Sequence, residues 1–159
     1  MKKILFSILF LGAWQWSVAQ ENAATDNAPE CVMLTISGNP ATHRAVSWRT
    51  EVGDTVSLAE LVQLRPSPDL AEHAKRVQGN HALWEDGAPD YKMGHKVNFT
   101  ELLPDTWYAY RVGNGEQWSE WFQFKTASNE TKPFSFLYFG DIQNDIKSLG
   151  ARTLRQAYS

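Results

Sequence analysis

The 159-residue chain contains one cysteine, Cys31, and few histidines, which limits the sites it can build. One cysteine excludes an intramolecular disulfide and a zinc site made of cysteines. We expect Cys31 to be a small buried side chain. The histidines show no paired metal-ligand spacing, and we expect them to face solvent or to lie at strand edges. Their positions are His43, His73, His81 and His95.

The chain also lacks a block of like charges. It has 15 basic and 18 acidic residues, giving a formal net charge of −3, and neither sign is concentrated in one stretch. Nucleic-acid and membrane-surface partners carry dense charge of one sign and usually need a complementary basic block. The sequence therefore predicts no nucleic-acid partner.

A long hydrophobic run is absent, but a short one opens the chain. Two lysines precede an apolar stretch over residues 4–13, and small residues lead to Ala19. This is the pattern of a secretory signal over residues 1–19, cleaved after Ala19, with a flexible mature terminus over residues 20–30. The stretch is too short to span a bilayer, and Cys31 lies too far downstream for a lipid anchor. We expect a secreted or periplasmic protein without a stable membrane anchor.

Alternation of apolar and polar residues is abundant between residues 31 and 127. Clusters of Gly, Pro, Asn, Asp and Ser separate the alternating segments, as in an antiparallel β-sandwich. A short helix or loop is expected after Pro68, because Leu70, Ala74 and Val77 would share a helical face and Gly79 could end it. The predicted strands are 32–36, 45–50, 56–64, 81–84, 95–99, 108–112 and 118–126.

Two kinds of aromatic residue stand out in this region. Tyr108 follows Pro104 closely, as in the tyrosine corner of sandwich domains, where the hydroxyl binds upstream backbone. Trp48 is predicted to lie in the core. Four further tryptophans leave two alternatives open: a stacking surface for a sugar or a lid over a substrate, or packing against a following domain. They are Trp84, Trp107, Trp118 and Trp121.

After a polar linker over residues 128–133, the chain changes character. Residues 134–139 form a short aromatic run that ends at Gly140 and Asp141, and a helical pattern follows. We predict a strand buried on both faces, a tight turn and a helix. An acid at the carboxyl end of such a strand lies where α/β folds place their chemistry. A simpler alternative is that Asp141 or Asn144 only caps the helix.

Two sets of residues resemble known families. The first resembles the fibronectin type III-like N-terminal domain of purple acid phosphatases, and it comprises Gly38-Asn39-Pro40, Ala45–Thr50, Leu103–Gly113 and Phe122-x-Phe124-x-Thr126. The second, Gly140-Asp141-x-Gln143, resembles the opening motif of calcineurin-like metallophosphoesterases. The order of sandwich, linker and Gly-Asp is more specific than either piece alone.

The resemblance implies a mainly β fold with two parts. The first is a fibronectin type III-like antiparallel β-sandwich over residues 31–127. The second, over residues 134–159, is the first strand–helix unit of an α/β metallophosphoesterase domain, so the chain resembles a truncated copy of a longer protein.

The resemblance also implies a dinuclear metal centre that hydrolyses phosphate esters. Its ligands in this chain would be Asp141 and Gln143, and Gln143 departs from the histidine usual at that position. An amide oxygen binds metal more weakly than imidazole does, so iron, zinc and manganese all remain open. No other catalytic residue would lie in the chain, which would be inactive by itself. The full-length parent would act on small phosphate esters. The alternative is a secreted fibronectin type III-like module that binds a glycan or a protein.

Overall fold

The computed structural model describes residues 27–85, 91–140 and 145–157. Within them, eight strands make up two four-stranded sheets. The strands are β1 (Glu30–Thr35), β2 (Arg44–Thr50), β3 (Leu58–Gln63), β4 (Lys75–Gln78), β5 (Asn80–Glu85), β6 (Tyr91–Phe99), β7 (Trp107–Gly113) and β8 (Phe122–Lys125). The helical elements are the 3₁₀ turn η1 (Leu70–His73), the π-helical turn η2 (Ile146–Gly150) and α1 (Ala151–Ala157).

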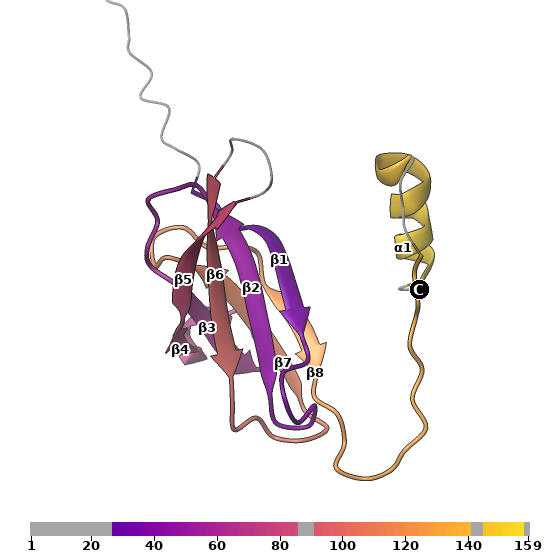
Figure 1. Ribbon diagram of the computed structural model, residues 1–159. Coiled ribbons are helices and arrows are strands. Elements are labelled where there is room, and N and C mark those ends of the chain that lie inside the picture. Colours follow the sequence, from indigo (N-terminus) through magenta and orange to yellow (C-terminus); the bar gives the residue numbers. More distant parts are fainter. Residues whose placement is uncertain (1–26, 86–90, 141–144, 158–159) are drawn as a thin grey trace, which may run out of the picture.

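The two sheets pack face to face as a sandwich (Figure 1). The strand order is β1-β2-β6-β5 in one sheet and β4-β3-β7-β8 in the other, and every pairing is antiparallel. Lettered along the chain, this places A, B, E and D in one sheet and C, F and G in the other, as in immunoglobulin-like sandwiches, with β4 added beside β3. The predicted β-sandwich is confirmed.

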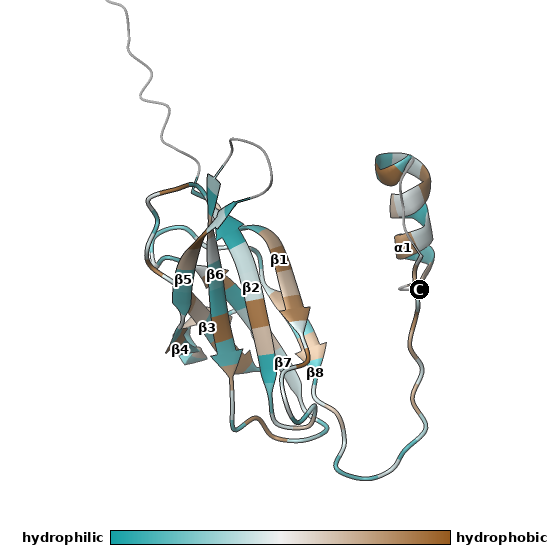
Figure 2. Cartoon of the chain, viewed as in Figure 1, coloured by the Kyte–Doolittle hydropathy of each residue, from teal (hydrophilic) through white to brown (hydrophobic). Residues whose placement is uncertain are grey.

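Strand alternation builds the core. In β2, Val46 and Trp48 point inward and pair with Val97 and His95 of β6, while Ser47 and Arg49 point outward. Figure 2 shows the same alternation as bands of high and low hydropathy along the strands. Trp48 is 2% exposed, which confirms its predicted place in the core. The other large core side chains are Val46, Leu61, Val97, Phe99, Leu102, Tyr108, Tyr110, Val112 and Phe124.

The tyrosine corner forms as predicted. The backbone N–H of Leu103 donates a 2.9 Å hydrogen bond to the Tyr108 hydroxyl. Tyr108 itself is buried and stacks on Phe124 of the neighbouring strand, with ring centroids 5.6 Å apart. The bond fixes the loop that joins β6 to β7, so the pattern read from Pro104 and Tyr108 has the expected physical basis.

The helix predicted after Pro68 is much shorter than its pattern suggested. Only η1 forms, and Val77 lies in β4, where it pairs with Ala59. Gly79 does not cap a helix but joins β4 to β5. A Cβ atom there would lie 2.1 Å from the carbonyl oxygen of Lys96, so this close approach of two backbones requires glycine. The chain can therefore cross from one sheet to the other in a single residue.

The strand predicted over residues 134–139 does not form. The chain from residue 127 to residue 140 has no regular secondary structure, and Phe134, Phe136 and Tyr138 are 83%, 77% and 88% exposed. A strand needs a hydrogen-bonded neighbour and a covering layer, and nothing in the described part of the chain supplies either. The predicted helix does follow, as η2 and α1, so the strand–helix unit is present only in part. Among the described residues, no helix has the length and apolarity to cross a membrane.

Candidate functional site

The predicted metal ligands, Asp141 and Gln143, lie outside the described residues, as does the proposed signal peptide. Their roles therefore stay predictions. On either side of them the structure describes Gly140, at the end of the exposed aromatic run, and Asp145, which has left-handed backbone (φ 52°) and precedes η2. In the described ranges, no three His, Cys, Asp or Glu side chains gather closely enough to hold a metal ion.

What the structure does define is the junction where the sandwich ends and this segment begins. Thr126 is 3% exposed, and its hydroxyl accepts a hydrogen bond from the Thr106 backbone N–H (2.9 Å) and donates one to the Leu103 carbonyl (2.6 Å). One residue further, the Ala127 N–H donates to the Pro40 carbonyl, and the Ala127 carbonyl accepts from the Asp105 N–H, both at 3.0 Å. These bonds fix the chain to both neighbouring loops up to residue 127.

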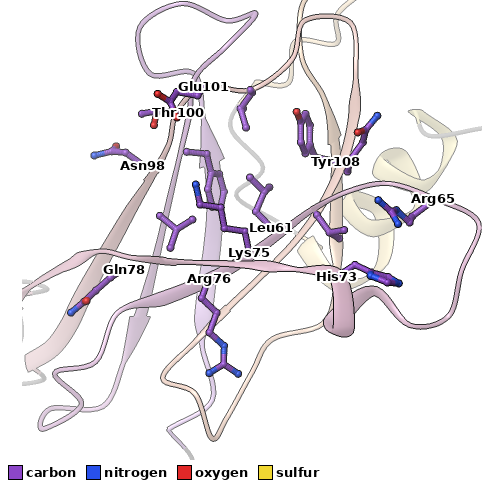
Figure 3. Close-up of a pocket in the computed structure, with 15 residues that line it drawn as sticks. Leu61, Arg65, His73, Lys75, Arg76, Gln78, Asn98, Thr100, Glu101 and Tyr108 are labelled. Atoms are coloured by element: carbon purple, nitrogen blue, oxygen red, sulfur yellow. The ribbon is translucent and has the colours of Figure 1, made fainter.

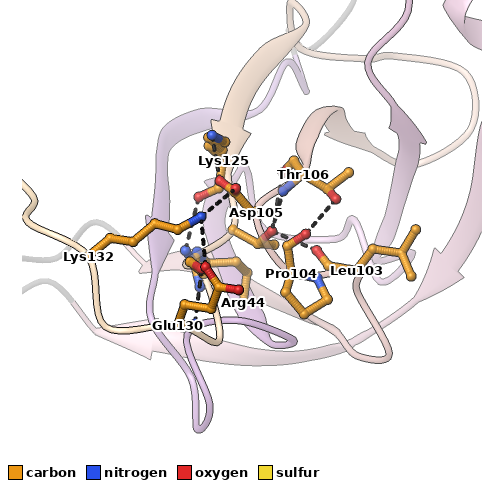
Figure 4. A network of polar contacts seen from close by, with 10 residues as sticks. Arg44, Leu103, Pro104, Asp105, Thr106, Lys125, Glu130 and Lys132 are labelled. Carbon is orange, nitrogen blue, oxygen red and sulfur yellow. Dashed lines mark hydrogen bonds and ion pairs between the residues drawn. The ribbon is translucent and has the colours of Figure 1, made fainter.

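Charged side chains extend this junction into the linker (Figure 4). Lys125 pairs with Asp105 at 2.6 Å, and Lys132 lies 3.5 Å from the other Asp105 oxygen and 3.3 Å from Glu130. The hydrogen bond from Lys125, together with the two lysine charges, lowers the pKa of Asp105. All of these groups are largely exposed, so the pairs orient the linker more than they stabilise the fold.

A cavity of about 560 Å³ lies at this junction. Its walls are Asp105, Lys125 and most of the linker from Thr126 to Phe134. Arg44, which is 8% exposed, supports the same region by donating hydrogen bonds to the carbonyls of Pro40 (2.6 Å), His43 (2.8 Å) and Lys125 (3.2 Å). Sequence reasoning missed this cluster, because its members come together only once the β7–β8 register is known.

His95 corrects the expectation that the histidines face solvent. It is 2% exposed, and its ring stacks on Trp48 with centroids 5.0 Å apart. Nε2 lies 2.8 Å from the Thr50 hydroxyl and Nδ1 lies 2.8 Å from the Ser57 hydroxyl, so both ring nitrogens are satisfied inside the core. Burial lowers the His95 pKa, against an opposing effect of Asp54. His95 is thus a neutral core residue and not a metal ligand.

Cys31 was expected to be buried and is instead exposed. It lies in β1 at the edge of its sheet, next to Arg49, whose Nη2 is 2.8 Å from the sulfur. Arg49 also lies over the Trp84 ring at 4.8 Å. Around these side chains is a shallow hollow of about 320 Å³, which we call the Trp84 hollow. It is lined by Cys31, Met33, Ser47, Trp48, Arg49, Trp84, Gly94 and His95.

The other tryptophans divide into two groups. Trp107 is 50% exposed. Trp118 and Trp121 instead hold Arg111 between them, at 4.6 and 4.9 Å. Arg111 in turn pairs with Glu60, which is 3% exposed and also binds Arg76. Trp118 and Trp121 therefore cover a buried carboxylate on the outer face of the second sheet, an arrangement that neither sequence alternative anticipated.

Comparison with known proteins assigns this fold. It shares its architecture with purple acid phosphatase PPD1 from yellow lupin (Lupinus luteus) seeds, at a TM-score of 0.52 and 18% identity. The match covers 66% of this chain and 20% of the lupin chain. The third fibronectin III domain of human KIAA0343 is also similar, at 15% identity and a TM-score of 0.39 over 75% of this chain and 99% of that one. No curated relative matches the chain.

The fold thus belongs to the class of antiparallel two-sheet sandwiches, and a domain of this class also occurs in a purple acid phosphatase. The family model for the purple acid phosphatase N-terminal domain matches residues 29–126. The chain belongs to this family, and the predicted membership is confirmed. It spans about a fifth of the lupin enzyme's length, as the 20% coverage shows.

Proposed function

We propose that the chain is the N-terminal part of an exported, metal-dependent phosphoesterase that hydrolyses small phosphate esters. The observation that carries this proposal is the family match over residues 29–126, followed after a short linker by Gly140-Asp141-x-Gln143. The junction at Thr126 gives the sandwich a role in the proposal. It fixes where the chain leaves the last strand, and so where the segment that leads to Gly140 begins.

The described residues do not by themselves fit a dinuclear metal centre. Such a centre needs several carboxylate, amide and imidazole ligands around two cations, and the described part of the chain brings no three such acidic, cysteine or histidine side chains together. His95 is committed to the core by its two hydroxyl partners. We therefore assign no catalytic step to the described residues, and we propose that the chain alone is inactive. When bound in the longer protein, the metals would activate a water for attack on phosphorus.

The test compares this chain with the longer protein that the proposal requires the gene to encode. In an assay with p-nitrophenyl phosphate, we expect the longer protein to turn over substrate, to lose activity with a chelator and to recover it with metal. We expect the 159-residue chain to show no turnover above background. A coding sequence that continues without further Asp, Asn and His motifs would overturn the proposal.

Two substitutions in the longer protein locate the site. Asp141→Ala should lower turnover by about a hundredfold or more, because it removes a direct ligand and even outer-shell changes cost about 10–100-fold. The matched control is Asp145→Ala, the same change four residues further along the chain, which should leave turnover close to the starting value. Equal activities of the two variants would remove Asp141 from the metal centre.

A second candidate function, a secreted binding module, is favoured by the Trp84 hollow. Trp84 is 48% exposed and Met33 is 59% exposed, so the hollow presents apolar surface on the outer face of a sheet. Exposed aromatic rings of this kind stack on sugars or on partner side chains. Glycan or protein binding that is lost in Trp84→Ala but kept in Trp107→Ala would support this function for the chain alone.

A further inference from the structure

A second cavity, of about 500 Å³, opens between the two sheets on the side where β4 faces β6 (Figure 3). Fifteen residues line it, and they fall into an apolar floor and a polar rim. The floor is formed by Leu61, Val62, Val77, Phe99, Leu102 and Tyr108. The rim includes Arg65, His73, Lys75, Arg76 and Glu101. We call this feature the inter-sheet cavity.

The cavity exists because strand pairing stops early on this side. β5 pairs with β6 only from Tyr91 to Lys96, so residues 97–99 of β6 have no partner strand on that edge in the described structure. The side chains behind the opening belong to the core: Leu61 is 9% exposed and Phe99 is 1% exposed. The opening therefore leads directly to packed apolar side chains.

Positive charge gathers at the rim. Arg65 and Lys75 make no ion pair within the described part of the chain. Arg76 does not add to this charge, since it is paired with Glu60, and in Figure 3 it points away from the cavity. Glu101 is the one acidic residue among those lining the cavity. A local excess of cations contrasts with the chain's net charge of −3.

Lys75 is placed to link the rim to the floor. It pairs with Leu61 across β3 and β4, so it stands on the inward side of its strand, as Val77 does two residues later. In Figure 3 its side chain reaches toward the middle of the cavity, while Arg65 and His73 lie toward one end. An inward-pointing charge on an edge strand also discourages pairing with another sheet, so that role must be separated from ligand binding.

We propose that the inter-sheet cavity binds an organic anion, with its apolar group against the floor and its carboxylate or phosphate held by Lys75. The volume of about 500 Å³ is in the usual range of small-molecule sites. A charged hydrogen-bond donor in such a site fixes the orientation of the bound anion. This proposal does not rest on the phosphoesterase proposal, because it uses the sandwich alone.

The probes are 2-naphthyl phosphate and 2-naphthoate, added separately to the full chain and followed by backbone amide NMR shifts. The controls are 2-naphthol, which lacks the charge, and inorganic phosphate, which lacks the apolar group. We expect saturable shifts at Leu61, Val77 and Phe99 with both naphthyl anions. Both controls should bind at least tenfold more weakly. A factor of ten corresponds to about 1.4 kcal/mol, which is the order expected for losing one charged contact. If inorganic phosphate binds and the naphthyl anions do not bind more tightly, the floor contributes nothing to binding and the proposal fails.

Substitutions separate binding from edge protection. Lys75→Gln should weaken binding of the naphthyl anions by about tenfold with the protein still folded and monomeric. The matched control is Lys96→Gln, an exposed lysine on a neighbouring strand that does not line the cavity, and it should bind like the starting protein. Equal binding by both variants, equal binding of 2-naphthol, or no saturable shift would each overturn the proposal.

Discussion

The sandwich and the C-terminal segment (residues 128–157) are both rich in aromatic residues, but they use them in opposite ways. Phe99 in β6 is 1% exposed and contacts Tyr110 and Phe124 as ring pairs, whereas Phe136 in the segment is 77% exposed. Local sequence is apolar in both places. The difference lies in the partners: Phe99 pairs with Arg44 of β2 and has a second sheet behind it, and the segment has neither a pairing strand nor a covering sheet in the described structure.

The largest expected effect is the difference in stability when one phenylalanine is replaced by alanine in each of the two regions. Phe99→Ala should lower the free energy of unfolding by about 3–5 kcal/mol, because it empties a packed core site. Phe136→Ala should change it by less than about 0.5 kcal/mol, as is usual for surface substitutions. Urea unfolding followed by tryptophan fluorescence measures both. A large loss for Phe136→Ala would show that the segment packs against the sandwich after all.

A smaller effect should appear as a pH dependence that belongs to the sandwich. The folded protein holds the His95 pKa below its usual value, chiefly by burial, so the unfolded chain takes up a proton first as pH falls. Stability should therefore be full above the unfolded histidine pKa of about 6.5 and should decline as pH drops below it.

The measurement is the urea midpoint between pH 7.5 and pH 5.0. His95→Gln should flatten the decline below pH 6.5, although it also lowers stability at every pH because the ring stacks on Trp48. His73→Gln, at an exposed position, is the control and should follow the starting protein. An unchanged slope in His95→Gln would mean that other groups cause the decline.

The tyrosine corner should give a still smaller change. Tyr108→Phe removes the hydroxyl that accepts the Leu103 N–H and leaves the ring in place. The expected cost is about 1 kcal/mol, the typical net value of one hydrogen bond. Faster hydrogen exchange confined to the Leu103 amide, with the Trp48 signal unchanged, would locate the effect in the loop. No change in either quantity would show that the bond contributes nothing.

The smallest effect is expected at the junction itself. Lys132→Gln removes two exposed ion pairs, which are worth little in water, so the free energy of unfolding should stay within error of the starting value. Linker mobility should rise instead, measured as lower heteronuclear NOE values over residues 128–133. Equal NOE values would mean that the hydrogen bonds at Thr126 and Ala127 orient the linker without help from the charges.

Much of the sandwich could be predicted from sequence, because period-two alternation and turn residues act locally. The strand around Trp48 and the corner at Tyr108 are examples. The errors occur where a partner distant in sequence decides. His95 looked like a surface histidine until Thr50 and Ser57 supplied hydroxyls inside the core. Val77 fitted a helix pattern, but pairing with Ala59 makes it part of a strand.

The candidate metal site was less predictable than the fold. Asp141 and Gln143 rest on a short motif, and no three His, Cys, Asp or Glu side chains gather among the described residues to support it. Cys31 shows a related limit: its small apolar character suggested burial, but its place at the edge of a sheet leaves it exposed. The junction at Asp105 and Lys132 was invisible in the sequence, since it depends on how β7 and β8 align.

The exposed run from Phe134 to Phe139 has a practical consequence for handling the protein. Four of these six residues are aromatic, and the run has no charge and no proline, which is the composition of segments that stack into intermolecular β-structure. A shortened chain that stops at Lys132 keeps every hydrogen bond made by Thr126. It should stay in solution at concentrations where the 159-residue chain precipitates. Light scattering of the two chains side by side would measure how strongly this run favours self-association.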